Sequence, residues 1–281
     1  MSNLKTATLT LLAMIAFASN SLLCRLALKD TAIDAASFTT VRMLSATLML
    51  GLLIGFKPSV YRNNGNWPSA LALFAYAAGF SFAYIHLSAG TGALLLFGAV
   101  QATMISVGIY KGERLAGWRL IGFGLAIGGL VALLLPGLSA PPLLSAISMV
   151  GAGVAWGIYS LRGKGVGNPI AATAGNFLRT LPLTACLSLL MFQQMAWDAP
   201  GLVYAVLSGA LTSGIGYAIW YQVLPVLKST TAATVQLSVP MFAAAGGVLL
   251  LSEPLGWRLL VASLAILMGI ALVIHQKQKA P

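Results

Sequence analysis

A few amide side chains stand inside long apolar stretches of the chain, where a polar group is unusual, and three of them are candidates for binding a ligand. They are Asn20, Gln101 and Gln236. An amide offers both a hydrogen-bond donor and an acceptor, so each can bind a polar ligand. Each can instead hydrogen-bond to a neighbouring helix, a contact that contributes about 0.6 kcal/mol inside a membrane. We favour the ligand role for Asn20 and a structural one for Gln236, and both stay open for Gln101.

Aromatic side chains form two groups in separate apolar stretches. Tyr76, Phe80 and Tyr84 are spaced by four residues, which places them on one face of a helix. Tyr217 and Trp220 form the second group. One such stripe usually serves helix packing, but two in matching halves favour a shared cavity. The candidate substrate-binding residues are Asn20, Phe80, Tyr84, Gln101, Trp156, Tyr159, Tyr217, Trp220 and Gln236.

Two arginines, Arg42 and Arg179, also lie within apolar stretches. A guanidinium group could hold a carboxylate through two parallel hydrogen bonds. It could instead cap the carbonyl groups of a neighbouring helix or extend its charge to the membrane surface. We prefer the structural interpretation for both arginines.

Several kinds of chemistry are missing from the chain. All five acidic residues lie between the apolar stretches, whereas proton-coupled pumps usually relay protons through an intramembrane carboxylate. We therefore expect a facilitator or an exchanger. The chain has no phosphate-binding Gly-rich loop for ATP and no cluster of His, Cys and carboxylate residues for acid–base or metal chemistry. We expect no enzyme, no cofactor and no metal site.

The composition indicates an integral membrane protein. Of the 281 residues, 59% are hydrophobic and only 7% are charged, whereas a soluble domain carries roughly 25% charged residues. The apolar stretches are about 20 residues long, which is enough to cross a bilayer as helices. The net charge of +11 does not indicate nucleic acid, because the basic residues separate the apolar stretches and form no patch. The expected partners are the lipid bilayer and a small molecule.

The fold class predicted is all-α, with ten transmembrane helices. The connectors are short, and the longest of them, Lys57–Asn66, is predicted to be a plain loop. The ten expected segments are 5–28, 35–56, 67–87, 90–110, 116–135, 142–161, 169–192, 200–222, 229–251 and 258–275.

A short phrase occurs twice, about half the chain apart. Glu113 is followed by Gly-Trp at Trp118, and Glu253 is followed by Gly-Trp at Trp257. A long apolar stretch precedes and follows each copy, as expected of an internal duplication. Each half would hold five spans, and halves with an odd number of spans insert in opposite directions. This inverted repeat is typical of secondary transporters. The two repeats are residues 5–135 and 142–275.

The basic residues predict the orientation in the membrane. If the N-terminus is cytoplasmic, eleven of the 16 Lys and Arg residues fall on the cytoplasmic side and three on the other. An excess of Lys and Arg in short loops marks the cytoplasmic side. Both termini are therefore expected in the cytoplasm, with the protein in the inner membrane.

These features resemble the drug/metabolite transporter superfamily, and specifically its EamA-type members. The resemblance rests on the repeated Glu…Gly-Trp phrase, on residues 16–20 and 155–159 in the first span of each half, on Arg42 and Arg179 in the second spans, and on Pro240. It covers nearly the whole chain. Among the branches, the ten-helix aromatic amino acid exporters are most similar. The chain departs from the family pattern at residue 17, where Phe17 replaces a Trp.

The resemblance implies a secondary transporter that works by alternating access. We expect it to export small amphipathic metabolites, above all amino acids including aromatic ones, by facilitated diffusion or exchange. The alternative is an exporter of hydrophobic drugs or nucleoside-like metabolites on the same fold. An intramembrane enzyme would need an acid–base pair within the spans, and the sequence holds none.

Overall fold

The computed structural model describes residues 3–110, 112, 117–134, 140–163, 166–227 and 235–275. Within these residues the regular elements are helices. They are α1 (Asn3–Asp30), α2 (Ala35–Ile54), α3 (Pro58–Asn63), α4 (Trp67–Tyr84), α5 (Ala89–Tyr110), α6 (Trp118–Leu134), α7 (Leu143–Arg162), α8 (Pro169–Leu190), α9 (Ala199–Leu207), α10 (Gly216–Val223), α12 (Ser238–Leu251) and α13 (Trp257–His275). The segment between α9 and α10 is the π-helix η2 (Ser208–Ile215), and two single turns of 3-10 helix are η1 (Phe192–Gln194) and η3 (Leu224–Val226).

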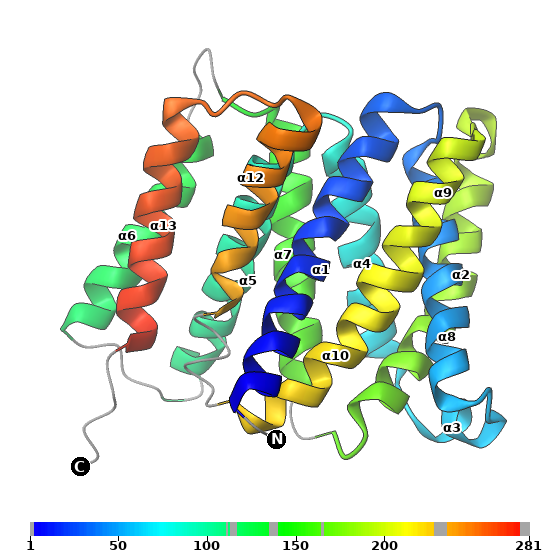
Figure 1. The fold of residues 1–281 in the computed structure, drawn as a ribbon. Coiled ribbons are helices and arrows are strands. Elements are labelled where there is room, and N and C mark those ends of the chain that lie inside the picture. Colours follow the sequence, from blue (N-terminus) through cyan, green and yellow to red (C-terminus); the bar gives the residue numbers. More distant parts are fainter. Residues whose placement is uncertain are drawn as a thin grey trace.

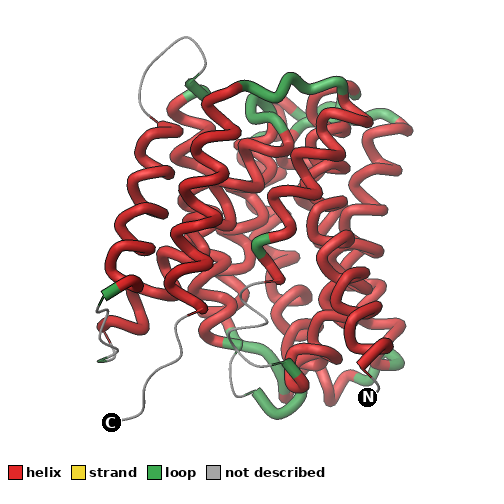
Figure 2. The backbone as a smooth tube through the Cα atoms, turned by 60° about the vertical axis from the view of Figure 1, so that its left-hand side comes forward, coloured by secondary structure: helices red, strands yellow, loops and turns green. Residues whose placement is uncertain are grey.

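The long helices stand side by side, and the described loops lie at the two ends of the bundle (Figures 1 and 2). The pair α6 and α13 forms one edge, and α2 and α8 lie at the opposite edge (Figure 1). α1 begins and α13 ends on the same side, at the bottom of Figure 1. We call this the terminal side and the other the opposite side.

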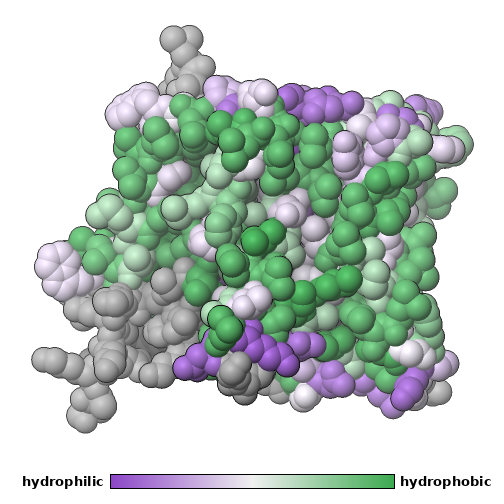
Figure 3. Space-filling view, viewed as in Figure 1, coloured by the Kyte–Doolittle hydropathy of each residue, from purple (hydrophilic) through white to green (hydrophobic). Residues whose placement is uncertain are grey.

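The surface fits a bilayer. Hydrophobic residues cover the middle of the face shown in Figure 3, and hydrophilic residues gather along its upper and lower edges. In the described part of the chain, α1, α2, α5, α7 and the continuous segment Ala199–Val223 are long and apolar enough to cross a membrane. Shorter apolar helices occupy Leu120–Ala132, Ser238–Leu251 and Trp257–Leu272. The chain is thus an all-helical, multi-pass membrane protein.

Helices from the two halves of the chain are packed against one another. α7 lies against α4 and α5, and α1 lies against α10 and α12. α2 contacts both α8 and η2, while α4 also contacts α8. α5 contacts α12, and α6 contacts α13. The predicted repeat would match α1, α2, α4, α5 and α6, in this order, to α7, α8, the segment Ala199–Val223, α12 and α13. When each helix is exchanged for its match, the set of contacting pairs stays the same.

The connector Lys57–Asn66, predicted to be a plain loop, contains the helix α3, so that prediction was wrong. Pro58 occupies the start of α3, where its fixed φ angle suits a helix and its missing N–H is not needed. Arg179 from α8 donates hydrogen bonds to the carbonyl groups of Tyr61 and Asn64. These contacts satisfy carbonyls at the end of α3 that have no partner within the helix.

The helix expected over 200–222 lies in the continuous segment Ala199–Val223, which contains the π-helix η2 at its centre. A π-helical stretch is rare and often marks a functional site. η2 lies close to α2 because Gly209 has no side chain. A Cβ atom at Gly209 would collide with Ser45 Oγ and with the carbonyl oxygen of Arg42.

This close approach yields a stability prediction. We expect Gly209→Ala to lower the free energy of unfolding by about 1–3 kcal/mol, the usual cost of overpacking a core. The matched control is Gly151→Ala in α7, because a Cβ atom at Gly151 meets nothing within 4 Å. Thermal unfolding of the purified protein in detergent measures both variants. Equal stability of the two would contradict the packing described.

Candidate functional site

A small cavity lies in the centre of the bundle, between helices of both halves. Its volume is about 20 Å³, which is space for about one water molecule. Its lining is mostly aromatic. The lining residues are Phe17, Asn20, Ser21, Tyr76, Phe80, Leu96, Phe97, Trp156, Thr212 and Tyr217. The site is therefore closed around its own side chains in this conformation.

The aromatic rings around this cavity form one connected cluster. The ring centroid of Trp156 lies 4.8 Å from that of Tyr76 and 5.1 Å from that of Tyr217. Tyr76 in turn lies 5.4 Å from Phe80. These separations are typical of favourable aromatic pairs. Trp156 from α7 thus joins the aromatic face of α4 to that of α10.

A hydrogen-bond network borders the cluster, with Asn20 at its centre. The Asn20 side-chain oxygen accepts bonds from Ser208 (2.6 Å) and Thr212 (3.1 Å) of η2. Its nitrogen donates to the Tyr76 hydroxyl at 3.3 Å. Asn20 is only 6% exposed, so these bonds satisfy an amide that water does not reach. The network connects α1, α4 and η2.

The two intramembrane arginines have different surroundings. Arg179 donates to the carbonyl oxygens of Tyr61, Asn64 and Gly175, which confirms its predicted capping role. For Arg42 the structural interpretation stays a prediction, because its hydrogen bonds are of a different kind. Arg42 is 1% exposed, and its hydrogen bonds go to the side chains of Tyr76 and Ser213.

The structure places four candidate residues, Asn20, Phe80, Trp156 and Tyr217, together in the central cavity. Others lie next to it. Tyr84 packs edge-on against Phe80, with ring centroids 4.7 Å apart.

Trp220 packs in the same way against Phe17, at 6.1 Å. Gln101 is buried in α5, four residues after the lining residue Phe97. Gln236 is partly buried and precedes α12, outside the cavity. Pro240 has no N–H, so it cannot donate the helical hydrogen bond to the backbone carbonyl of Gln236 four residues earlier.

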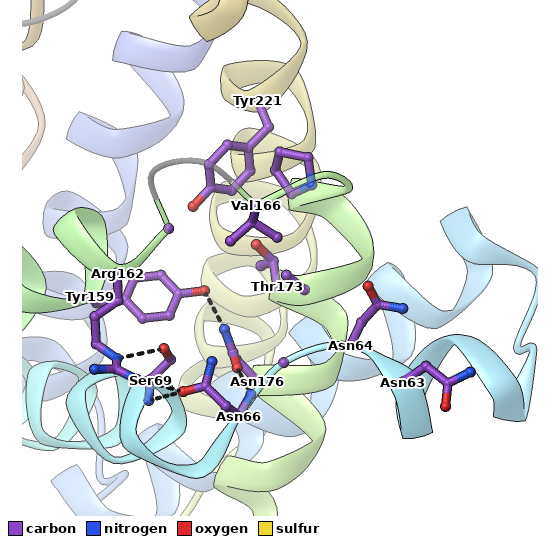
Figure 4. Close-up of a pocket in the computed structure, with 14 residues that line it drawn as sticks. Asn63, Asn64, Asn66, Ser69, Tyr159, Arg162, Val166, Thr173, Asn176 and Tyr221 are labelled. Atoms are coloured by element: carbon purple, nitrogen blue, oxygen red, sulfur yellow. Dashed lines mark hydrogen bonds between the residues drawn. The ribbon is translucent and has the colours of Figure 1, made fainter.

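Tyr159 belongs to a second cavity of about 150 Å³ on the terminal side. Its hydroxyl accepts a hydrogen bond from Asn176 (3.4 Å), and Arg162 donates to Ser69 and Asn66 (Figure 4). The lining is rich in amides and hydroxyls. The Tyr159 ring is 5.4 Å from Trp156, so this aromatic pair separates the polar cavity from the central one.

On the opposite side, an ion pair joins the two halves. Arg25 Nε lies 3.1 Å from Glu253 Oε1, and Arg25 also donates to the carbonyls of Tyr84 and Ile85. The other Glu253 oxygen accepts from the backbone N–H of Ala89. Glu253 belongs to the repeated phrase, so this phrase helps to hold α1, α4, α5 and α12 together. Its counterpart Glu113 lies outside the described residues.

Comparison with known proteins finds a family match in the second half of the chain. The model of the EamA-like transporter family matches residues 143–275. An uncharacterized protein of Pseudomonas aeruginosa is 57% identical over 276 residues, covering 98% of this chain and 96% of its own. An uncharacterized transporter of Archaeoglobus fulgidus is 25% identical over 197 residues, covering 69% and 70% of the two chains. Residues 143–275 are thus similar to the EamA-like transporter family.

A solved crystal structure has a similar fold. It aligns with a TM-score of 0.67 over 99% of this chain and 100% of its own, at 18% identity. The EamA-like family is a family of transporters and not of enzymes, so the match over residues 143–275 supports membrane transport of small molecules.

The candidate residues named from the sequence do not include Phe17, Tyr76 or Thr212, which line the cavity. Tyr76 belongs to the predicted aromatic stripe, and Arg42, considered above as a carboxylate binder, lies beside two lining rings. The spacing of Tyr76 from Phe80 was a usable signal, since both lie on one helical face. No pattern in the sequence marks Thr212, because it faces Asn20 only through the packing of η2 against α1.

The Asn20 network yields a prediction. We expect Asn20→Leu to lower the free energy of unfolding by about 1–3 kcal/mol, because the buried hydroxyl of Ser208 loses its acceptor. Thr8→Ala in the same helix is the control, since Thr8 is exposed and its change should stay within about 0.5 kcal/mol. Thermal unfolding in detergent compares the two variants. Asn20→Leu as stable as Thr8→Ala would show that the network contributes nothing.

Proposed function

We propose that this protein exports small amphipathic metabolites, chiefly amino acids including aromatic ones, by alternating access. The observation that supports this most is the central cavity, which lies between the two halves and is lined by Phe80, Trp156 and Tyr217. An aromatic lining binds apolar side chains of different shapes, and few hydrogen-bonding groups restrict the choice. Broad specificity follows. The nine candidate residues named from the sequence are proposed to form or adjoin the substrate path.

The proposed architecture is ten transmembrane helices in two inverted repeats, residues 5–135 and 142–275, with both termini in the cytoplasm of an inner-membrane protein. The exchange of packing pairs between the halves supports the repeat. The excess of Lys and Arg in the connectors of the terminal side supports the orientation. With this orientation, the 150 Å³ polar cavity faces the cytoplasm.

Transport would then need two barriers to open in turn. On the cytoplasmic side the barrier is the ring pair Trp156–Tyr159. On the outer side it is the Arg25–Glu253 ion pair with its backbone contacts. Opening one barrier while the other stays closed gives alternating access. None of the described residues that line the central cavity is a carboxylate, so the substrate gradient is proposed as the driving force.

The alternative substrates are hydrophobic drugs or nucleoside-like metabolites. The same aromatic lining would stack against a drug ring or a nucleobase. Measuring the exchange of drugs and nucleosides beside that of amino acids, in the transport experiment that follows, distinguishes these substrate classes.

The transport prediction uses purified protein in liposomes preloaded with unlabelled amino acids. We expect saturable uptake of labelled aromatic amino acids that is indifferent to a pH gradient. Trp156→Ala should reduce this exchange about tenfold or more, because it removes the ring that contacts Tyr76, Tyr159 and Tyr217. The control is Trp67→Ala, whose ring is 52% exposed at the start of α4. If drugs or nucleosides are exchanged and amino acids are not, the substrate assignment is wrong.

A topology prediction tests the inverted repeat. Alkaline phosphatase fused after Gln194, in the connector between α8 and α9, should be active, because this enzyme folds only outside the cytoplasm. The same fusion after Asn64, next to α3, should be inactive, and green fluorescent protein at the C-terminus should fluoresce. Activity at both internal positions would reject the proposed arrangement of helices.

A further inference from the structure

Arg42 carries a positive charge into the centre of the bundle. It lies about two turns into α2, and its side chain is among the largest fully buried ones. Nη2 donates to the Tyr76 hydroxyl at 3.0 Å, and Nε lies 3.3 Å from Ser213 Oγ. The remaining nitrogen, Nη1, is buried and has no hydrogen-bond partner. A guanidinium group with five N–H donors is therefore only partly satisfied.

No acidic side chain in the described part of the chain balances this charge. Asp34 and Asp198 cap the starts of α2 and α9. Glu253 pairs with Arg25, and Asp30 lies beside Lys29. A buried charge without a counter-ion is costly, so proteins keep one mainly where it has a function.

The equivalent arginine of the second half shows what a structural role looks like. Arg179 directs one nitrogen at three backbone carbonyls, two of them at the end of α3. Arg42 has hydroxyl partners instead, those of Tyr76 and Ser213. Hydroxyls neutralise less of a cation's charge than a carboxylate does, and they can be exchanged for another acceptor.

Arg42 is linked directly to the central cavity. Its guanidinium carbon lies 5.3 Å from the ring centroid of Tyr76 and 5.0 Å from that of Phe80, and both rings line the cavity. The Tyr76 hydroxyl contacts Arg42 on one side and Asn20 on the other. A movement of the Tyr76 ring would therefore open the guanidinium to the cavity.

We propose that Arg42 binds the carboxylate of the transported substrate, and that a carboxylate is the group the transporter requires. The inference rests on the proposed function, since it concerns the same cavity. The carboxylate takes the place of the Tyr76 hydroxyl and engages Nη1, so that the buried cation gains its counter-ion only when substrate is bound. The ammonium group of an amino acid has no acidic partner in the described cavity lining. Removing the ammonium therefore costs less affinity than removing the carboxylate.

The first test needs no variant. Purified wild-type protein is titrated with L-phenylalanine, with hydrocinnamate, which lacks the ammonium group, and with phenethylamine and phenylalaninamide, which lack the carboxylate. Ligand-induced thermal stabilisation reports binding. Hydrocinnamate should bind about ten- to hundredfold more tightly than phenethylamine or phenylalaninamide, the range that a charge-assisted hydrogen bond contributes. Equal binding of the four compounds, or no stabilisation by either carboxylate at millimolar concentration, would overturn the proposal.

Three variants separate binding from folding. Arg42→Gln should bind hydrocinnamate and phenethylamine equally, and it should unfold at the same temperature as wild type or higher without ligand, because a buried unpaired charge is gone. Arg42→Lys should keep the carboxylate preference with weaker binding, since it keeps the charge but not the fork. Arg179→Gln is the matched control, which should lose stability and keep the preference. If Arg42→Gln still prefers carboxylates, Arg42 is not the residue that binds the carboxylate.

The same compounds then compete with labelled L-phenylalanine in liposomes. Carboxylates that bind but are not exchanged would reject the proposed transport and leave Arg42 as the carboxylate site. Exchange of phenylalanine that phenethylamine and hydrocinnamate inhibit equally would leave the transport function standing and reject the role of Arg42.

Discussion

A bilayer offers no water to polar groups, and this constraint governs where every polar contact in the molecule lies. The starts of four helices are capped by side chains that accept backbone N–H bonds. These side chains are Asp34, Asn66, Asn168 and Asp198. Asp34 and Asn168 cap α2 and α8, and Asn66 and Asp198 cap α4 and α9. These caps satisfy N–H groups at the helix starts, which have no partner within the helix.

With the helix ends satisfied, small residues decide how closely the helices approach. α7 packs against α5 at Gly153 and Gly157, where added Cβ atoms would contact Ala99 and Thr103. Such close packing replaces the hydrophobic effect, which does not hold helices together within lipid. The approach of α7 brings Trp156, which lies between these glycines in the sequence, against the aromatic face of α4. The packing of backbones thus sets the position of the site.

The polar groups that remain in the centre are few and connected. Asn20, Tyr76 and Arg42 form one chain of hydrogen bonds with the hydroxyls of η2. Inside a low-dielectric bundle such a network stiffens when every member is satisfied and is costly when one is not. Arg42 is the member that is not fully satisfied. The network therefore combines a part around Asn20, whose amide is bonded at both ends, with a part that the proposed substrate carboxylate would complete.

The sequence by itself determined the class of structure and much of the site. Apolar length and sparse charge predicted a helical membrane protein, and the matching polar and aromatic positions pointed to Asn20, Phe80, Trp156 and Tyr217 as neighbours. Tertiary structure alone decided the rest, because it depends on contacts between distant segments. It placed the helix α3, held by Arg179, within the connector Lys57–Asn66 and a π-helix beside α2. It also gave Arg42 and Arg179 different partners. Arg42 and Arg179 occupy the same position in the proposed repeat. Only the neighbours that packing brings to each side chain determine whether it bonds to backbone carbonyls, as Arg179 does, or to buried hydroxyls, as Arg42 does.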